Sequence, residues 1–213
     1  STIGDVYIVS EVDKDRVIGR PVIYVIVDEA SRMVTGLHVS IYNASWKEAK
    51  MTLLNAFLPK EEYCRRYGLT YSNLDWPCAH IPRYLLADRA EFLGIKSEEH
   101  LEGLGLQIGL ASKLRGDWKG VVERKFGIAN EQSLHDLPGT TRGQIRKRGE
   151  KDPSEYAFYT LNEITKLLIT LFVEYNKNQQ VDQLVTRDLI RLDKAATPLN
   201  FWNYHVENHT DSL

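Results

Sequence analysis

The sequence predicts an α/β domain in which one mixed, five-stranded sheet is flanked by helices. Two observations support this class. The first forty residues contain three strand-like segments with short connections, and after residue 45 two further strand-like segments alternate with segments of helical periodicity. This order, β-β-β-α-β-α-β-α-α, is typical of a sheet covered by helices.

The first three predicted strands cover residues 2–10, 21–27 and 33–41. The first is rich in β-branched and aromatic residues. The second is a continuous apolar run, as in strands that are buried on both faces. Because the connections are short, we expect an antiparallel meander. Asp28, with Ser31 and Arg32, is expected to stabilise the turn between the second and third strands rather than to bind metal.

A helix is predicted to begin after Ser45, a favoured N-cap, with Glu48 completing a capping box. Apolar residues recur at helical spacing until Pro59 stops the run. The later predicted elements are helical turns at 60–67, strands at 83–87 and 106–110, and helices at 97–101, 117–130, 161–175 and 198–206. Residues 131–155 are polar and glycine-containing and are expected to form a long loop. We expect a core domain over 1–178 and a C-terminal extension over 179–213.

Composition fits an ordinary globular protein. The 213 residues are 43% hydrophobic and 26% charged, and 27 basic against 29 acidic side chains give a net charge of −2. The apolar runs are far below the roughly 18 residues of a membrane-spanning helix, and no signal peptide is recognisable. Two cysteines favour a reducing compartment, so we expect a cytoplasmic protein without a membrane partner. A first residue other than Met leads us to expect an excised or processed fragment.

Two acidic residues are candidates for metal ligands and for catalysis. Asp88 follows the predicted strand 83–87, at the end where α/β sheets build their sites. Glu123 lies on the predicted helix 117–130, opposite most of its apolar residues and beside Gly120 and Gly127. Each glycine costs about 1 kcal/mol in a helix relative to alanine, which indicates a need for open space beside this carboxylate. Two acids on rigid elements can share Mg²⁺ ions that act on a phosphodiester. The alternatives are a turn-forming Asp88 and a solvated helix face around Glu123.

Basic residues cluster near these acids and are candidates for contacts with DNA phosphates. The candidates are Arg89, Lys113, Arg115, Lys119 and Arg124, with Lys125 in the same window. The alternative is a solvated face and, for Arg89, an ion pair with Glu91. A second basic cluster over 142–151 fits either DNA contact or a solvated loop. Cys64, Cys78 and His80 lack the spacing of a zinc site and are expected to pack in the interior. The sequence has no GxxxxGK[ST] motif, which argues against ATP hydrolysis.

Four separated segments carry a family resemblance. They are IGRPVIYVIVDEASRM (18–33), LLADRAEFL (85–93), GDWKGVVE (116–123) and ATPLNFW (196–202). With an Asp after the fourth strand and a Glu 35 residues later, the chain resembles the DDE transposases of the retroviral-integrase superfamily, which have an RNase H-like fold. Within that superfamily it is similar to the TnsB family, the DNA-breaking and joining subunits of Tn-seven-type transposons, which are relatives of Mu transposase.

The resemblance implies metal-dependent cleavage at transposon 3′ ends and strand transfer of the 3′-hydroxyl into target DNA. It assigns Asp88 and Glu123, with a third acid, to two Mg²⁺ (or Mn²⁺) ions. The family's first Asp belongs to an Asp-x-Thr pattern, and Ser1-Thr2 places it just before Ser1, so the fragment carries two of the three acids and its activity is in question. Asp5, the nearest acid, is expected to be an ordinary surface residue.

The resemblance also implies partners and neighbouring domains. These are transposon-end DNA, target DNA, a TnsA-like endonuclease subunit, a TnsC-like AAA+ ATPase regulator and further copies in an oligomer on DNA, at the bacterial nucleoid. DNA-end-reading domains would precede the chain and a small β-barrel would follow it. Two alternatives stay open: a non-catalytic DNA-binding or assembly module, and a hydrolytic nuclease of the same fold.

Overall fold

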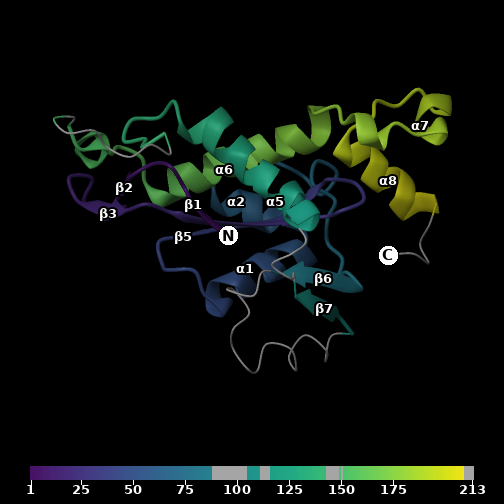
Figure 1. Cartoon of the computed structure of the whole chain (residues 1–213), viewed down its shortest axis with the longest axis horizontal. Helices are drawn as coiled ribbons and strands as arrows, with labels where there is room; N and C mark the ends of the chain where they lie inside the picture. Colours follow the sequence, from purple (N-terminus) through teal and green to yellow (C-terminus); the bar gives the residue numbers. More distant parts are fainter. Residues whose placement is uncertain (88–104, 111–115, 143–148, 150, 209–213) are drawn as a thin grey trace.

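The computed structural model describes residues 1–87, 105–110, 116–142, 149 and 151–208, which form a mixed α/β structure (Figure 1). Its main sheet is antiparallel, with the strand order β1 (Thr2–Ile3), β4 (Val22–Val27), β5 (Val34–Ser40). Helix α1 lies on one side of this sheet and α6 on the other. The α/β class predicted from the sequence is thereby confirmed.

The predicted helices lie close to the observed ranges, except that the predicted helix 97–101 falls outside the described residues, and the short helix over 187–191 was not predicted. Their bounds are α1 Trp46–Phe57, α2 Lys60–Arg66, α5 Gly116–Ala129, α6 Leu161–Asn178, α7 Arg187–Arg191 and α8 Pro198–Asn208. The predicted loop 131–155 is wrong in part, because it contains most of the π-helical turn η1 (Asn130–Leu134) and the 3-10 turn η2 (Pro153–Tyr156). Leu134 is fully buried and anchors η1 in the core. A third short turn, η3 (Asp182–Leu184), precedes α7. No helix in the described ranges has the length and apolar character needed to cross a bilayer.

The predicted single five-stranded sheet is wrong, because the described strands form three small sheets. Besides the main sheet, β2 (Ile8–Val9) and β3 (Val17–Gly19) pair in an antiparallel hairpin. β6 (Tyr84–Ala87) and β7 (Gln107–Leu110) pair with each other in parallel.

The main sheet is small because the predicted strand 2–10 is interrupted at Asp5. The Asp5 N–H donates to Asn130 Oδ1 (3.0 Å), and the Asp5 carbonyl accepts from the Thr141 N–H (2.8 Å). Backbone groups that would extend a strand are therefore used by later segments, and β1 ends after two residues. β6 meets the main sheet through side chains instead, since Leu85 and Ile26 pack against the same buried cluster.

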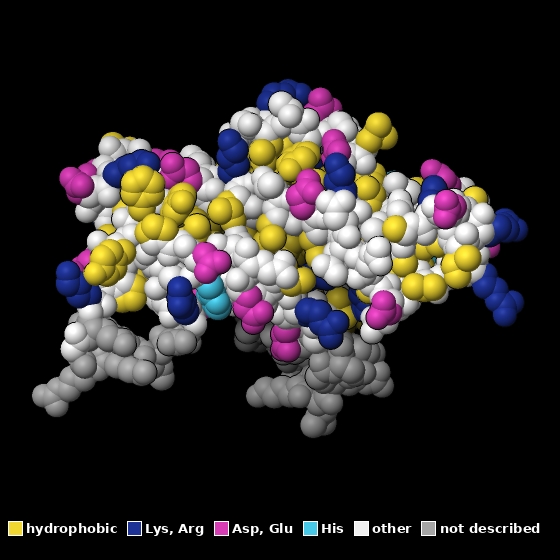
Figure 2. All heavy atoms as spheres, turned by 90° about the horizontal axis from the view of Figure 1, so that it is seen from above, with side chains coloured by type: hydrophobic (Ala, Val, Ile, Leu, Met, Phe, Trp, Pro, Cys, Tyr) yellow, Lys and Arg dark blue, Asp and Glu magenta, His cyan; other side chains and the backbone are white. Residues whose placement is uncertain are grey.

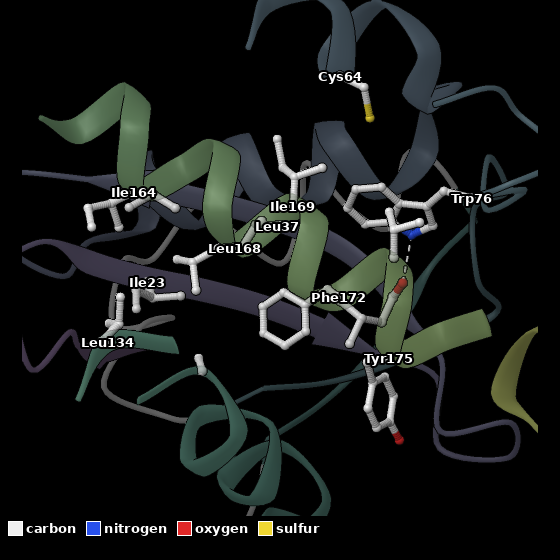
Figure 3. Close-up of a cluster of buried hydrophobic side chains, with 14 of the residues drawn as sticks. Ile23, Leu37, Cys64, Trp76, Leu134, Ile164, Leu168, Ile169, Phe172 and Tyr175 are labelled. Atoms are coloured by element: carbon white, nitrogen blue, oxygen red, sulfur yellow. Dashed lines mark hydrogen bonds between the residues drawn. The ribbon is translucent and has the colours of Figure 1, made fainter. Parts of the chain in front are cut away.

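The first half of β4, residues 22–24, is buried on both faces, as its continuous apolar sequence predicted, whereas residues 25–27 are only partly buried. Val22 and Tyr24 pack with Ala49 of α1, whereas Ile23 belongs to the main core on the opposite face. That core is built largely on α6, whose inward side chains include the fully buried Phe172 (Figure 3). Alternation along one strand thus places a helix on each side of the sheet.

The capping box predicted at the start of α1 forms only in half. Ser45 Oγ accepts from the Glu48 N–H, but the Glu48 carboxylate contacts His38 Nε2 (2.9 Å), and the Ser45 N–H donates to the Tyr24 hydroxyl. The reciprocal contact is lost because His38, on the neighbouring strand, offers the carboxylate a closer partner. A complete capping box stands at Thr160, the N-cap of α6.

Side chains fill hydrogen-bonding positions along β5. Asn176 of α6 is fully buried; its Oδ1 accepts from the Val34 N–H (2.9 Å) and its Nδ2 donates to the Val34 carbonyl (3.0 Å). The indole N–H of Trp76 donates to the same carbonyl (2.7 Å), the dashed line in Figure 3. Asn55 of α1 accepts from the Leu37 N–H (2.9 Å). These contacts tie helices on both faces to one strand.

Lys60 is the first residue of α2, and its buried ammonium group lies at the C-terminal end of α1. It is 0% exposed, and its ammonium donates to the carbonyl oxygens of Ala56 (3.2 Å), Leu58 (2.7 Å) and Cys78. Burial lowers the pKa of Lys60 to about 8. Burial also raises the pKa of Cys64 to about 11 and that of Cys78 to about 12. Both thiols are buried and pack in the main core, as the sequence predicted.

Substitution of Lys60 by Met is expected to change how stability depends on pH. The pKa of about 8 in the folded state lies below the model-peptide value of 10.5, so the unfolded state binds more protons over this interval. The penalty for burying Lys60 is therefore full below pH 8 and is relieved as pH rises. We expect the free energy of unfolding of the wild type, relative to Lys60→Met, to rise by about 1 kcal/mol between about pH 7.5 and 9.

Urea denaturation at several pH values measures this difference. Cys64 and Cys78 lie near Lys60, and their ionisation in the unfolded state lowers the free energy of unfolding as pH rises, which opposes the effect of Lys60. Both cysteines are present in the wild type and in Lys60→Met, so this contribution is common to the two proteins. Lys166→Met, at an exposed position on α6, is the matched control. If the free energy of unfolding depended on pH in the same way in the wild type and in Lys60→Met, the lowered pKa of Lys60 would be contradicted.

Candidate active site

Glu123 stands on the exposed side of α5, as predicted. Within the described parts of the chain its carboxylate has neither an ion-pair nor a hydrogen-bond partner. A Cβ added to Gly120 or Gly127 would meet nothing within 4 Å, so the space that these glycines indicated is present. The opposite side of α5 is held in the fold by the buried Ala129. The helix therefore presents an exposed carboxylate that no described side chain neutralises.

Glu123 lines a cavity of about 740 Å³ that several distant segments share. Ser1 and Thr2 at the start of β1 line it, and so does Ala87, the last residue of β6. Pairing of Thr2 with Ile23 fixes the first segment to β4, and α5 also packs on β4. The volume falls in the range of ligand-binding pockets. The fold thus joins the opening residues, the end of β6 and α5 at one hollow.

The structure tests only some of the predicted site residues. Ala87, which lines the cavity, directly precedes Asp88 in sequence. The remaining predicted residues lie outside the described residues or have side chains outside them: Asp88, Arg89, Lys113, Arg115 and Lys119. Arg124 is described and is exposed next to Glu123 on α5. Of the two predicted acids, the structure therefore places Glu123 at the cavity.

Two further acids near the start of the chain have structural partners. Asp28 lines the cavity, but its Oδ2 accepts from the Ser31 N–H (2.7 Å) and hydroxyl (2.6 Å), which confirms its role in the turn. The prediction that Asp5 is an ordinary surface residue is wrong. Its side chain is 15% exposed, pairs with Arg20 (2.6 Å) and contacts His135 Nε2 (3.0 Å). The contacts with Arg20 and His135 come from segments 15 and 130 residues away, so the local sequence did not reveal them.

Lys125 does not belong to the exposed basic face on which the sequence window placed it. It is 3% exposed, and its ammonium donates to the Tyr175 hydroxyl of α6 and lies 3.7 Å from the centre of that ring. Burial, with Arg124 and Arg32 nearby, lowers the pKa of Lys125 to about 7. Helical spacing indicates this position, since Lys125 and Ala129 are four residues apart on the same side. Arg32, read from the sequence as a turn residue, is the basic side chain near this site that sequence reasoning missed.

The donor chemistry at the cavity suits a hard divalent cation in part. Glu123 offers free carboxylate oxygens, the ligands that Mg²⁺ prefers. Among the described residues, no three His, Cys, Asp or Glu side chains gather as a metal-binding group. Glu123 thus fits one position of a carboxylate site, and Asp88 follows the residue that lines the same cavity.

Comparison with known proteins identifies the family. The model of the TnsB C-terminal domain matches residues 1–139. The chain belongs to this TnsB family. It is 30% identical over 214 residues to the transposon Tn7 transposition protein TnsB of Escherichia coli, a match that covers 100% of this chain and 30% of the relative. It is 27% identical over 208 residues to the transposase for transposon Tn552 of Staphylococcus aureus, covering 95% of this chain and 36% of the relative. The chain therefore spans about a third of the length of these two relatives.

Proposed function

We propose that this chain is the catalytic core of a DDE transposase with an RNase H-like fold. The observation that carries the proposal is the cavity shared by Glu123, the opening residues Ser1 and Thr2, and Ala87 at the end of β6. These are the three places at which the family resemblance puts its acids. The antiparallel β1–β4–β5 sheet, followed by the parallel β6–β7 pair, supports the fold assignment.

In this proposal Asp88 and Glu123, with an Asp immediately before Ser1, hold two Mg²⁺ or Mn²⁺ ions. Such ions, when bound, supply charge stabilisation for the attacking and leaving oxygens of a phosphodiester displacement. The chain's own part is to fix these carboxylates on rigid elements and to orient the DNA strand. Arg124, which is exposed beside Glu123, would contact a flanking phosphate.

The reaction is cleavage of a phosphodiester at each transposon 3′ end, followed by attack of the freed 3′-hydroxyl on target DNA. No covalent protein intermediate is required, because the hydroxyl attacks the target phosphodiester directly and releases its leaving 3′-oxygen. The substrates are transposon-end and target DNA. The name of the Tn7 relative supports a role for this chain in a Tn7-type transposition system. In such a system its partners would be TnsA-like and TnsC-like proteins and further copies of itself on DNA.

A strand-joining assay tests this function. The chain with one Asp added before Ser1 is incubated with a labelled duplex that ends in a free 3′-hydroxyl, a supercoiled target plasmid, and Mg²⁺ or Mn²⁺. We expect label to become covalently joined to plasmid DNA only when the metal is present. Hydrolysis without joining would instead indicate a nuclease, and binding without chemistry would indicate a non-catalytic assembly module.

A further inference from the structure

Arg32 lies in the turn between β4 and β5, and its charged side chain is partly buried. Its backbone is left-handed (φ 62°), in a turn held by the contacts between Asp28 and Ser31. One guanidinium nitrogen, Nη1, is buried and has no hydrogen-bond partner in the described part of the chain. Buried donors are nearly always satisfied, and a charged one costs more than a neutral one when it is not. The side chain is therefore positioned for an acceptor that the described chain does not supply.

Two further cations lie near Arg32. Lys125 donates to the Tyr175 hydroxyl, and Arg32 and Arg124 both act electrostatically on Lys125 and on Tyr175. Figure 3 shows the Tyr175 hydroxyl at the end of a ring that points away from the core side chains of α6. None of the three cations forms an ion pair with a carboxylate of the described residues. We call Arg32, Arg124 and Lys125 the cationic cluster.

The cationic cluster is complementary to an anion with several oxygens. Like charges held together with little solvent repel one another, and an anion between them removes this repulsion. Guanidinium groups bind phosphate through paired N–H donors, which would also satisfy Arg32 Nη1. The nearby acids do not pair with these cations: Asp28 is hydrogen-bonded to Ser31, and Glu123 lines the cavity.

The position of the cationic cluster favours a DNA phosphate over an acidic protein segment. Arg124 follows Glu123 on α5, and the turn that ends at Arg32 begins with Asp28, which lines the same cavity as Glu123. Arg32, Arg124 and Lys125 do not line the cavity themselves, but Arg124 and the turn that ends at Arg32 adjoin residues that do, so a strand in the cavity would carry a neighbouring phosphate towards them. On the face seen in Figure 2, basic, acidic and hydrophobic side chains are intermixed.

We propose that Arg32, Arg124 and Lys125 form a binding site for one backbone phosphate of the DNA strand that occupies the Glu123 cavity. Arg32 and Arg124 contact the phosphate oxygens, and Lys125, hydrogen-bonded to Tyr175, adds charge from behind. The choice of DNA as the ligand rests on the proposed function. The site itself rests on the buried, unsatisfied guanidinium of Arg32.

Salt-dependent DNA binding tests the site without requiring catalysis. Affinity for a labelled duplex of about 30 base pairs is measured by fluorescence anisotropy between about 50 and 200 mM KCl. Arg32→Gln is expected to weaken binding about fivefold to tenfold and to reduce the slope of log K against log salt by about 0.9, the value for one phosphate. Arg32→Lys is expected to keep most of the slope. Arg65→Gln, which removes an exposed arginine paired with Glu61 and Glu62, is the matched control and leaves the slope unchanged.

Arg124→Gln, at an exposed position, provides a second variant whose folding does not depend on a buried group; it is expected to lower the slope by a similar amount. Slopes equal to that of Arg65→Gln in both variants would overturn the proposal. Polyglutamate binding that is lost in Arg32→Gln while DNA binding is kept would also overturn it, in favour of an acidic protein ligand. If these variants lower the slope of log K against log salt but the chain joins no DNA strands, the phosphate site is supported and only the proposed transposase chemistry is contradicted.

Discussion

Replacing Glu123 by Gln is expected to reduce strand joining at least about 1000-fold in the chain that carries the added Asp, a loss of about 4 kcal/mol in transition-state stabilisation. The amide keeps the size of the side chain but removes the negative charge that would hold a divalent cation. Glu123 is exposed and has no partner among the described residues, so its replacement should leave the fold intact. Joined product per unit time, with either Mg²⁺ or Mn²⁺, is the measurement.

The control for this prediction is Glu131→Gln. Glu131 is an exposed acid in η1, immediately after α5, so its substitution changes the net charge by the same amount close to the same helix. We expect joining in this variant to stay within about twofold of the unsubstituted chain, since surface charge acts weakly at a distance. Joining by Glu123→Gln within tenfold of the control would remove Glu123 from the proposed metal site.

Replacing Asn176 by Leu is expected to lower the free energy of unfolding by about 3 kcal/mol. The substitution removes both side-chain contacts to Val34 and leaves the Val34 N–H buried without an acceptor, while the Val34 carbonyl keeps its bond from Trp76. A buried unpaired amide costs about 1–3 kcal/mol, and the loss of a hydrogen bond adds to it. Urea denaturation followed by circular dichroism measures the change.

Asn178→Leu is the matched control, because Asn178 is exposed two residues along α6 and bonds only to the exposed Glu174 within the described chain. We expect a change of less than about 0.5 kcal/mol for a surface substitution of this kind. Similar destabilisation by the two variants would show that the contacts of Asn176 with Val34 add nothing beyond helix propensity.

Local sequence patterns predicted the elements better than their assembly. The apolar run of β4 and the helical spacing in α6 follow from burial, which the residues themselves encode. The separation of β1 from β2 could not be predicted, because it depends on Asp5 meeting Asn130 and Thr141 from far along the chain. The incomplete capping box at Ser45 has the same origin: a histidine on another strand competes for Glu48.

The candidate site shows the same division. Gly120 and Gly127 indicated open space beside Glu123, and the structure contains it. The meeting of Ser1, Ala87 and Glu123 at one cavity is a property of the assembled fold, which the spacing of 35 residues between the two predicted acids suggested only through the family resemblance. Lys125 belongs to the basic window in sequence but falls among the apolar residues of the helix, and the structure buries it there.

The side chains that bond to β5 also limit how copies of this chain can associate. A strand at the border of a sheet normally offers free N–H and C=O groups to a strand from another molecule. Here Asn55, Trp76 and Asn176 already occupy such groups at Leu37 and Val34. Addition of a strand from another molecule is thereby disfavoured at the β5 edge of the main sheet, since a newcomer would have to displace buried side chains from Val34 and Leu37.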